Sequence, residues 1–322
     1  MANPTDIIPK GTRLVAAIGM FDGVHLGHLT LLDALKREAV ARGMASAVFT
    51  FKQHPRQVLH PEHEVKMLMS LTAKLQAIRQ QGIDYIVPLE FTPELSQLSA
   101  LEFMRMLHTY GVKVLLMGYN HRFGHDRSSS FADYVRWGTE LGIDVVKAPE
   151  YLGQYAPVSS SIIRNLITAG KVDDALHCMG RPYSLCGRVV HGFRNGRAMG
   201  FPTANVGEIA ADVLIPHNGA YAVMVWLKGQ WWQGMVNVGY RPTLGESNRL
   251  SIEVNVFDFE GDVYGEPITL QFIQFLRLEF KMVSVDELRR QLEHDRDKAR
   301  TILTAYCESH PQPSTLTLNY KP

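Results

Sequence analysis

Two histidines lie three residues apart in the stretch IGMFDGVHLGH, residues 18–28, where an apolar segment runs through glycines into a helical pattern. His25 and His28 fall at or just before the expected start of that helix. Unpaired backbone N–H groups and the positive end of the helix dipole favour anions at such a position. Two imidazoles there can donate to negative charge that develops on a phosphate. Either histidine alone is more typical of an ordinary turn residue, but the whole constellation favours a phosphate site.

The elements on either side of the turn set the position of the histidines. Residues 14–18 (LVAAI) form a continuous apolar run, as expected of a strand buried on both faces of a parallel sheet. Glycines in the turn let the backbone bend sharply and approach a ligand. Leu32, Leu35 and Val40 then recur at helical spacing up to Gly43, which is expected to end the helix.

A second polar stretch is expected at the same edge of the sheet. Residues 117–127 (MGYNHRFGHDR) follow an apolar strand and carry Asn120 and Arg122 in a glycine-containing loop, for which we expect contacts with ATP. A metal site formed by His121 and His125 is the alternative, although the loop offers no obvious third ligand.

A third stretch, residues 157–164 (PVSSSIIR), places three hydroxyls at a helix start and Arg164 one turn later. Hydroxyls and free N–H groups at a helix start can hold the β and γ phosphates of a nucleotide while an arginine neutralises their charge. The alternative for these serines is an ordinary helix N-cap.

The second half of the chain has its own glycine- and arginine-rich segment, residues 187–205 (GRVVHGFRNGRAMGFPTAN). Its glycines make it flexible enough to cover phosphates, and its arginines supply positive charge. Thr203 and Asn205 alternate, so in an extended segment both side chains point the same way. Two neutral oxygen ligands suit Mg²⁺, which takes much of its coordination shell from water and substrate phosphates. The alternative is a hairpin with two solvated side chains.

Glu253 lies in an apolar strand pattern, RLSIEVNVFDF. A carboxylate there is either an ordinary residue of the solvent face or a positioned general base. Period-two alternation groups it with Ser251, Asn255 and Phe257, a face that is not uniformly apolar. The spacing alone therefore leaves both interpretations open.

The composition limits the class of protein. The chain has 322 residues, about twice a typical domain, and 46% of them are hydrophobic. Lys and Arg number 33 against 32 Asp and Glu, which argues against a dedicated binder of nucleic acid or anionic membrane. Three sparse cysteines indicate reduced thiols in a cytoplasmic protein, and no apolar run is long enough to span a bilayer.

The pattern of elements predicts two domains of different class. Up to Pro182, strand and helix patterns alternate, which indicates a doubly wound parallel sheet whose ligands bind beyond the carboxyl ends of its strands. After Pro182, strands follow one another through Gly, Asn and Pro turns, which indicates an antiparallel sheet or small barrel, closed by a helix from Ser284. We expect domains at 1–182 and 183–309, and a loosely ordered tail at 310–322.

Two sets of motifs resemble one family. FDGVHLGH (21–28), FKQHP (51–55), GYNHRFG (118–124) and SSSIIR (159–164) resemble the adenylyltransferase module of bacterial bifunctional riboflavin kinase/FAD synthetases, a nucleotidylyltransferase fold with an HxGH signature. GRAMGFPTAN (196–205), NVGYRPT (237–243), IEVNVFDFEGDVYG (252–265) and FLRLEFK (275–281) resemble its riboflavin kinase module, expected to be an antiparallel barrel.

The resemblance implies a role for each matching position. His25, His28 and Arg164 would serve adenylyl transfer, Glu253 would accept the proton of the riboflavin 5′-hydroxyl, and Thr203 and Asn205 would bind Mg·ATP. The remaining positions, expected to contact ATP or flavin, are Gly19, Phe21, Asp22, Gly23, Asn120, Arg122, Ser159, Ser160, Ser161, Gly187, Arg188, Gly192, Arg197, Gly200, Phe201, Pro202, Asn237 and Arg277.

The function implied is ATP-dependent phosphorylation of riboflavin to FMN, followed by adenylyl transfer from ATP to FMN, which gives FAD and pyrophosphate. Both steps would need Mg²⁺. The alternatives are a riboflavin kinase whose first domain is inactive or has another specificity, and a non-catalytic flavin-binding sensor. We expect a cytoplasmic monomer or weak homo-oligomer with small-molecule substrates and no nucleic-acid or membrane partner.

Overall fold

The computed structural model describes residues 8–60, 62, 64–118, 122–125, 129–191, 200–243, 246–279 and 284–310. The chain forms two compact units. The first comprises Met1–Met67 and Leu71–Val158, and the second Leu68–Ser70 and Ser159–Pro322.

As predicted, a parallel sheet forms the centre of the first unit. It has five strands in the order β3-β2-β1-β4-β5. Its strands are β1 (Leu14–Ile18), β2 (Ala45–Phe51), β3 (Tyr85–Leu89), β4 (Val112–Met117) and β5 (Asp144–Lys147). All five residues of β1 are buried, as expected of the central strand. The direction of strand progression reverses between β1 and β4, which is where doubly wound sheets bind ligands at the carboxyl ends of their strands.

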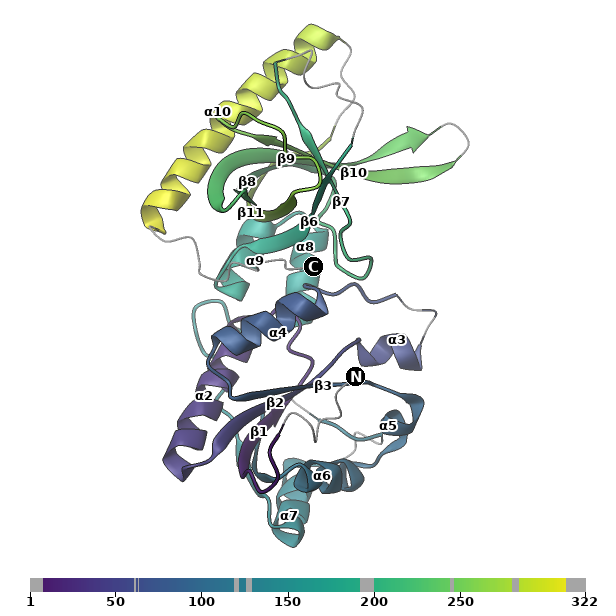
Figure 1. Ribbon diagram of the computed structural model, residues 1–322, viewed down its shortest axis with the longest axis vertical. Coiled ribbons are helices and arrows are strands. Elements are labelled where there is room, and N and C mark those ends of the chain that lie inside the picture. The colour runs from purple at the N-terminus through teal and green to yellow at the C-terminus, as the bar shows by residue number, and fades with distance from the viewer. Residues whose placement is uncertain are drawn as a thin grey trace. The chain divides into compact units, whose positions relative to one another are not determined.

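Helices connect these strands, with α4 on one side of the sheet and α6 and α7 on the other in Figure 1. They are α2 (Leu26–Arg42), α3 (Pro55–Leu59), α4 (Leu71–Gln80), α5 (Pro93–Gln97), α6 (Ala100–Thr109) and α7 (Phe131–Leu141). The sequence did not predict α3 or α5, because five residues are too few to show a helical period.

Helix α2 follows the turn that carries the two histidines and ends at Gly43, whose φ of 61° is left-handed, as predicted. Leu32 and Leu35 are buried, whereas Val40 is 81% exposed and Ala39 is buried instead. Successive residues of a helix differ by 100° around its axis, so the buried stripe passes through 39 and leaves 40 in solvent.

The second unit is built on a closed antiparallel barrel with strand order β10-β7-β6-β11-β8-β9. Its strands are β6 (Tyr183–Val190), β7 (Ala204–Gly207), β8 (Gly219–Leu227), β9 (Gln230–Thr243), β10 (Glu246–Val256) and β11 (Pro267–Arg277). The sequence left open whether these strands form an antiparallel sheet or a small barrel, and the structure shows a closed barrel.

Three helices pack with this barrel. They are α8 (Ser160–Thr168), α9 (Val172–Met179) and the long α10 (Val285–Ser309), which runs along the barrel wall in Figure 1. Ala299 and Leu303 of α10 are completely buried in a core shared with the strands, and Ser284 caps the helix by accepting a hydrogen bond from Glu287 N–H, as predicted.

The division into units differs from the expected boundary at residue 182, because α9 packs on β11 and β6 and so groups α8 and α9 with the barrel. The tail at 311–322 lies outside the described residues, so its loose order stays a prediction. Among the helices that the structure describes, none is long and apolar enough to cross a membrane.

Candidate functional site

The turn between β1 and α2 is held in an unusual backbone conformation. Gly19 N–H donates to Phe49 O at 3.1 Å and Thr50 Oγ1 donates to Met20 O at 3.1 Å, which fastens the turn to β2. Phe21 and Val24 have φ values of 50° and 38°, in the left-handed region that a β-branched residue rarely adopts. Both side chains are completely buried, so packing maintains a conformation that costs energy locally.

His25 is the N-cap of α2. Its backbone is extended, with φ −78° and ψ 175°, and its Nδ1 accepts a hydrogen bond from His28 N–H at 3.4 Å. An accepting Nδ1 leaves Nε2 as the protonated nitrogen of the neutral ring. The rings of His25 and His28 stack with their centroids 3.7 Å apart. A Cβ at Gly27 would lie 3.2 Å from His25 Cε1, so the glycine leaves room for this ring.

The residues expected to accompany the histidines are placed in part. Gly19, Phe21, Asp22 and Gly23 belong to this turn, where Asp22 is completely buried. Arg122 is exposed, and the next residue, Phe123, is fixed by hydrogen bonds of its backbone to the Tyr134 hydroxyl, at 3.1 Å from N and 2.7 Å from O.

Asn120 and His121 lie outside the described residues, so the contact with ATP expected there stays a prediction. Within the described part of the chain, no group of three or more His, Cys, Asp or Glu side chains could hold a metal ion.

Ser159 is the N-cap of α8 and accepts a hydrogen bond from Ile162 N–H at 3.3 Å, the ordinary arrangement that the sequence left as the alternative. Ser160 and Ser161 form the first turn of the helix, and Arg164 follows, half-buried, one turn later. These residues belong to the second compact unit, whereas His25 and His28 belong to the first. Their joint action on one nucleotide therefore stays a prediction.

Strand pairing in the barrel assembles a second polar cluster around Glu253 of β10. Glu253 is directly opposite Asn205 of β7 on one side and Asn237 of β9 on the other. The Thr203 hydroxyl donates to Glu253 Oε2 at 3.4 Å. Directly opposite residues of an antiparallel pair share one face of the sheet. The three residues expected to act in phosphoryl transfer, and Asn237 with them, thus lie at one place in the barrel.

Two residues that the sequence did not assign to the site support this cluster. Ser251 Oγ donates to Glu253 Oε1 at 3.1 Å, so hydroxyls bind both carboxylate oxygens. The buried Asn255 donates from Nδ2 to Pro202 O at 2.7 Å, which fixes the backbone beside Thr203. The signal that could have found them is their period-two spacing from Glu253 on a polar face.

The structure describes some of the other positions expected in the second unit. Phe201 is buried with the Arg296 guanidinium 5.7 Å from its ring centroid. Gly187 lets β6 and β7 approach closely, because a Cβ there would lie 2.4 Å from Gly207 O. Gly200 has a left-handed φ of 79°. Gly192 and Arg197 lie outside the described residues.

Two arginines expected to bind cofactor have protein partners in the structure. Arg188 donates from a terminal nitrogen to Gly265 O at 2.8 Å and lies 3.4 Å from the Glu208 carboxylate. Arg277 pairs from Nε with Asp295 of α10 at 2.8 Å. Their expected contacts with cofactor stay predictions.

Comparison with known proteins gives a consistent assignment. A family model described as FAD synthetase matches residues 8–162, and one described as riboflavin kinase matches residues 179–303. A solved structure named as a macrolide-efflux protein from Streptococcus pneumoniae aligns with a TM-score of 0.85 at 29% identity, over 93% of this chain and 97% of that one.

Curated relatives match nearly end to end. The bifunctional riboflavin kinase/FMN adenylyltransferase of Listeria monocytogenes is 35% identical over 89% of this chain and 91% of its own length. The protein of the same name from Pseudomonas fluorescens is 36% identical over 91% of this chain and 94% of its own length. The chain therefore belongs to the family of bifunctional riboflavin kinase/FMN adenylyltransferases.

Proposed function

We propose that the two activities of this enzyme, riboflavin kinase and FMN adenylyltransferase, belong to the two clusters described above. The Glu253 cluster of the barrel phosphorylates riboflavin to FMN, and the His25–His28 turn transfers AMP from ATP to FMN. The observation that carries the first assignment is the pairing of β10 with β7 and β9, which gathers a carboxylate, a threonine hydroxyl and two amides from three sequence motifs.

In the kinase step, Glu253 accepts the proton of the riboflavin 5′-hydroxyl as that oxygen attacks the γ-phosphorus of ATP, and the bond from that phosphorus to ADP breaks. The hydroxyls of Ser251 and Thr203 bind its two oxygens and hold the carboxylate in one orientation. Most of the catalysis in phosphoryl transfer is positioning and charge neutralisation, so a base fixed from both sides suits it.

The same cluster fits a magnesium ion bound mainly through phosphates. Because the Thr203 hydroxyl uses its proton to donate to Glu253, its oxygen lone pairs can accept a cation. Thr203 and Asn205 would hold the ion through neutral oxygens, as suits Mg²⁺ with substrate phosphates in its shell. When bound, the ion neutralises phosphate charge. We expect Thr203→Val to raise the Mg²⁺ concentration needed for half-maximal FMN formation, and an unchanged requirement would remove Thr203 from the metal site.

In the adenylyl-transfer step, a phosphate oxygen of FMN attacks the α-phosphorus of ATP, and the bond to pyrophosphate breaks. His25 caps α2, and it shares the anion-favouring N-terminus of that helix with His28. Both imidazoles stabilise the charge that develops on the α-phosphate. The serines at the start of α8 and Arg164 hold the departing pyrophosphate, and no covalent intermediate is required.

One experiment tests the separation of the sites. Each variant is incubated with Mg·ATP and either riboflavin or FMN, and the flavins are resolved by chromatography. His28→Ala should stop FAD formation and leave FMN formation intact, while Glu253→Gln should do the reverse. The matched control for His28→Ala is His108→Ala, because His108 lies on α6 and not in the turn between β1 and α2. The matched control for Glu253→Gln is Glu260→Gln, at an exposed glutamate.

Three outcomes would contradict the assignment. Loss of both activities in either variant would contradict separate sites. Wild-type enzyme that forms FMN but no FAD would favour a kinase with an inactive first unit, and unchanged riboflavin would favour a flavin-binding sensor. The balanced charge and the three free cysteines support a cytoplasmic enzyme that works on small molecules without nucleic acid or membrane. The proposal for its assembly is a monomer or weak homo-oligomer.

A further inference from the structure

The Glu253 cluster has two sides, defined by the strands that flank Glu253. Strand β10 lies between β7 and β9 in the closed barrel. On the β7 side are Thr203 and Asn205, to which the proposed function gives the metal and the phosphates of ATP. On the β9 side, directly opposite Glu253, is Asn237. A general base must reach the hydroxyl that attacks the phosphorus, so the acceptor alcohol approaches Glu253 from the side that the nucleotide leaves open, which is the β9 side.

A second carboxylate fixes the amide on this side. Asn237 Nδ2 donates to Glu279 Oε1 at 3.2 Å. A carboxylate only accepts hydrogen bonds, so it determines which end of the amide faces it. With Nδ2 directed at Glu279, the carbonyl oxygen of Asn237 is directed away from Glu279 and presents an acceptor beside Glu253.

Glu279 reaches this position because residue 239 is glycine. A Cβ on Gly239 would lie 2.5 Å and 2.7 Å from the two carboxylate oxygens of Glu279. Gly239 is opposite Ser251, two residues from the pair formed by Asn237 and Glu253. The Glu279 carboxylate therefore covers the part of β9 that lies next to the base and its supporting serine.

The segment that carries Glu279 is anchored to α10. Glu279 follows the end of β11 by two residues, and Arg277 at that end donates from Nε to Asp295 Oδ2 at 2.8 Å and from NH1 to Leu278 O at 3.0 Å. Asp295 is buried and also accepts from Gln291 Nε2 at 2.8 Å. These contacts fix the backbone on which the otherwise exposed Glu279 depends.

We propose that Glu279 is a positioning residue for the acceptor alcohol of the kinase reaction: it orients the Asn237 amide so that its oxygen accepts a hydrogen bond from a hydroxyl of the ribityl chain. The proposal rests on the assignment of Glu253 as the base of the riboflavin kinase site. It concerns riboflavin and not ATP, because Asn237 and the metal-binding residues lie on opposite sides of β10.

The test uses the full-length enzyme with Glu279→Ala, Gly239→Ala and the double variant. Glu279→Ala removes the carboxylate, and Gly239→Ala displaces it with a methyl group while keeping Glu279 in the chain. Gly239 is not in the left-handed region, so alanine fits its backbone. Either change should lower kcat/KM for riboflavin about tenfold, as for the loss of one charge-assisted hydrogen bond. The double variant should be no worse than the single ones, because both remove the same contact.

Two further measurements separate positioning from a general structural effect. The KM for ATP and the rate of FAD formation from FMN should stay at the wild-type values, and riboflavin affinity, measured by quenching of flavin fluorescence, should fall in parallel with kcat/KM. Glu293→Gln, a charge change at an exposed pair of α10, is the matched control.

Wild-type kinetics in Glu279→Ala, equal losses for riboflavin and ATP, or additive losses in the double variant would each overturn the proposal. Wild-type enzyme that forms no FMN would instead refute the proposed function. If the wild-type enzyme forms FMN and Glu279→Ala forms it at the same rate, only the role of Glu279 is refuted.

Discussion

The Arg277–Asp295 pair offers the strongest test of how α10 supports the barrel. The Arg277 side chain is 19% exposed and the Asp295 side chain 3%, so the pair is largely removed from water. Asp295→Asn keeps the size of the side chain but removes the buried negative charge that faces Arg277. In the wild type, each carboxylate oxygen of Asp295 accepts one hydrogen bond, from Arg277 or from Gln291. The asparagine has one side-chain oxygen to accept from both donors.

The expected cost follows from this geometry. Removing one partner of a fully buried pair costs about 3–5 kcal/mol, and the partial exposure of Arg277 reduces this to about 2–3 kcal/mol. For a unit of this size, that corresponds to a fall of about 5–10 °C in the melting temperature.

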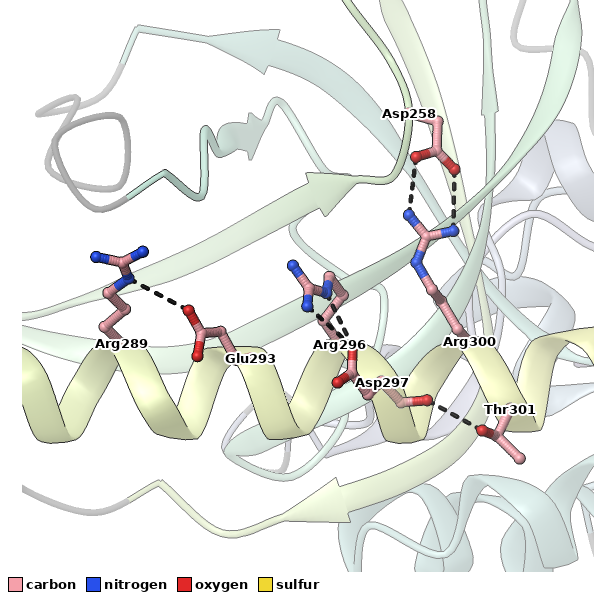
Figure 2. A network of polar contacts seen from close by, with 7 residues as sticks. All are labelled: Asp258, Arg289, Glu293, Arg296, Asp297, Arg300 and Thr301. Atoms are coloured by element: carbon pink, nitrogen blue, oxygen red, sulfur yellow. Dashed lines mark hydrogen bonds and ion pairs between the residues drawn. The ribbon is translucent and has the colours of Figure 1, made fainter.

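Glu293→Gln makes the same charge change on the same helix, at a pair whose side chains are 64% and 40% exposed (Figure 2), and should cost at most about 1 kcal/mol. Thermal unfolding followed by circular dichroism compares the two variants directly. Equal melting temperatures would refute the reasoning.

A paired substitution checks the physical cause. Replacing both partners, as in Arg277→Met with Asp295→Leu, removes the charge of Arg277 together with that of Asp295. We expect the double variant to recover most of the melting temperature that Asp295→Asn loses. Further destabilisation in the double variant would show that the Gln291 contact or the shape of the site, and not the charge of Arg277, sets the cost.

Two other perturbations test single contacts. Tyr134→Phe removes the buried hydroxyl that binds both backbone polar groups of Phe123, so it should destabilise the first unit by about 1–3 kcal/mol, measured by thermal unfolding. In the two flavin assays, the variant should form FAD more slowly and FMN at the normal rate. For Asp258, the hydrogen bonds from the Arg300 guanidinium, at 2.8 Å and 3.0 Å (Figure 2), lower the pKa of the carboxyl. The pair therefore stabilises the folded protein above the ordinary carboxyl pKa, and this stabilisation is lost as pH falls through the lowered value. Asp258→Asn should accordingly melt below wild type at neutral pH and together with it once the pH is below the lowered pKa, and a difference that persists in strong acid would contradict the assignment.

The sequence predicted the elements whose signal is local. The fully buried β1, the left-handed Gly43 that ends α2 and the start of α10 at Ser284 are each determined by neighbouring residues, and the structure confirms them. The short helices α3 and α5 were missed because they are held by end caps at His54 and Thr92 rather than by an amphipathic period. Closure of the barrel depends on pairing between distant strands, which no local pattern contains.

The His25–His28 turn and the Glu253 cluster also differ in how far apart their residues lie in the chain. His25, His28 and their turn are contiguous in the chain, so a strand, a glycine turn and a helix start were enough to predict an anion site. Thr203 and Glu253 are 50 residues apart, and Asn237 and Glu279 are 42 apart. From the spacing alone, Glu253 could equally have faced solvent, and only its resemblance to a family motif favoured the base.

The register of β10 explains why the polar cluster around Glu253 could not be predicted from the sequence pattern alone. In a strand, a shift of one residue turns every side chain to the other face. Such a slip of β10 would bring Ile252 or Val254, both buried, to the place of Glu253 and move the carboxylate away from Thr203 and Asn237. The alternation of these apolar neighbours with Ser251, Glu253 and Asn255 therefore does two things at once. It fixes the register by burying one face, and through that register it gathers the polar side chains of β7, β9 and β10 into one site.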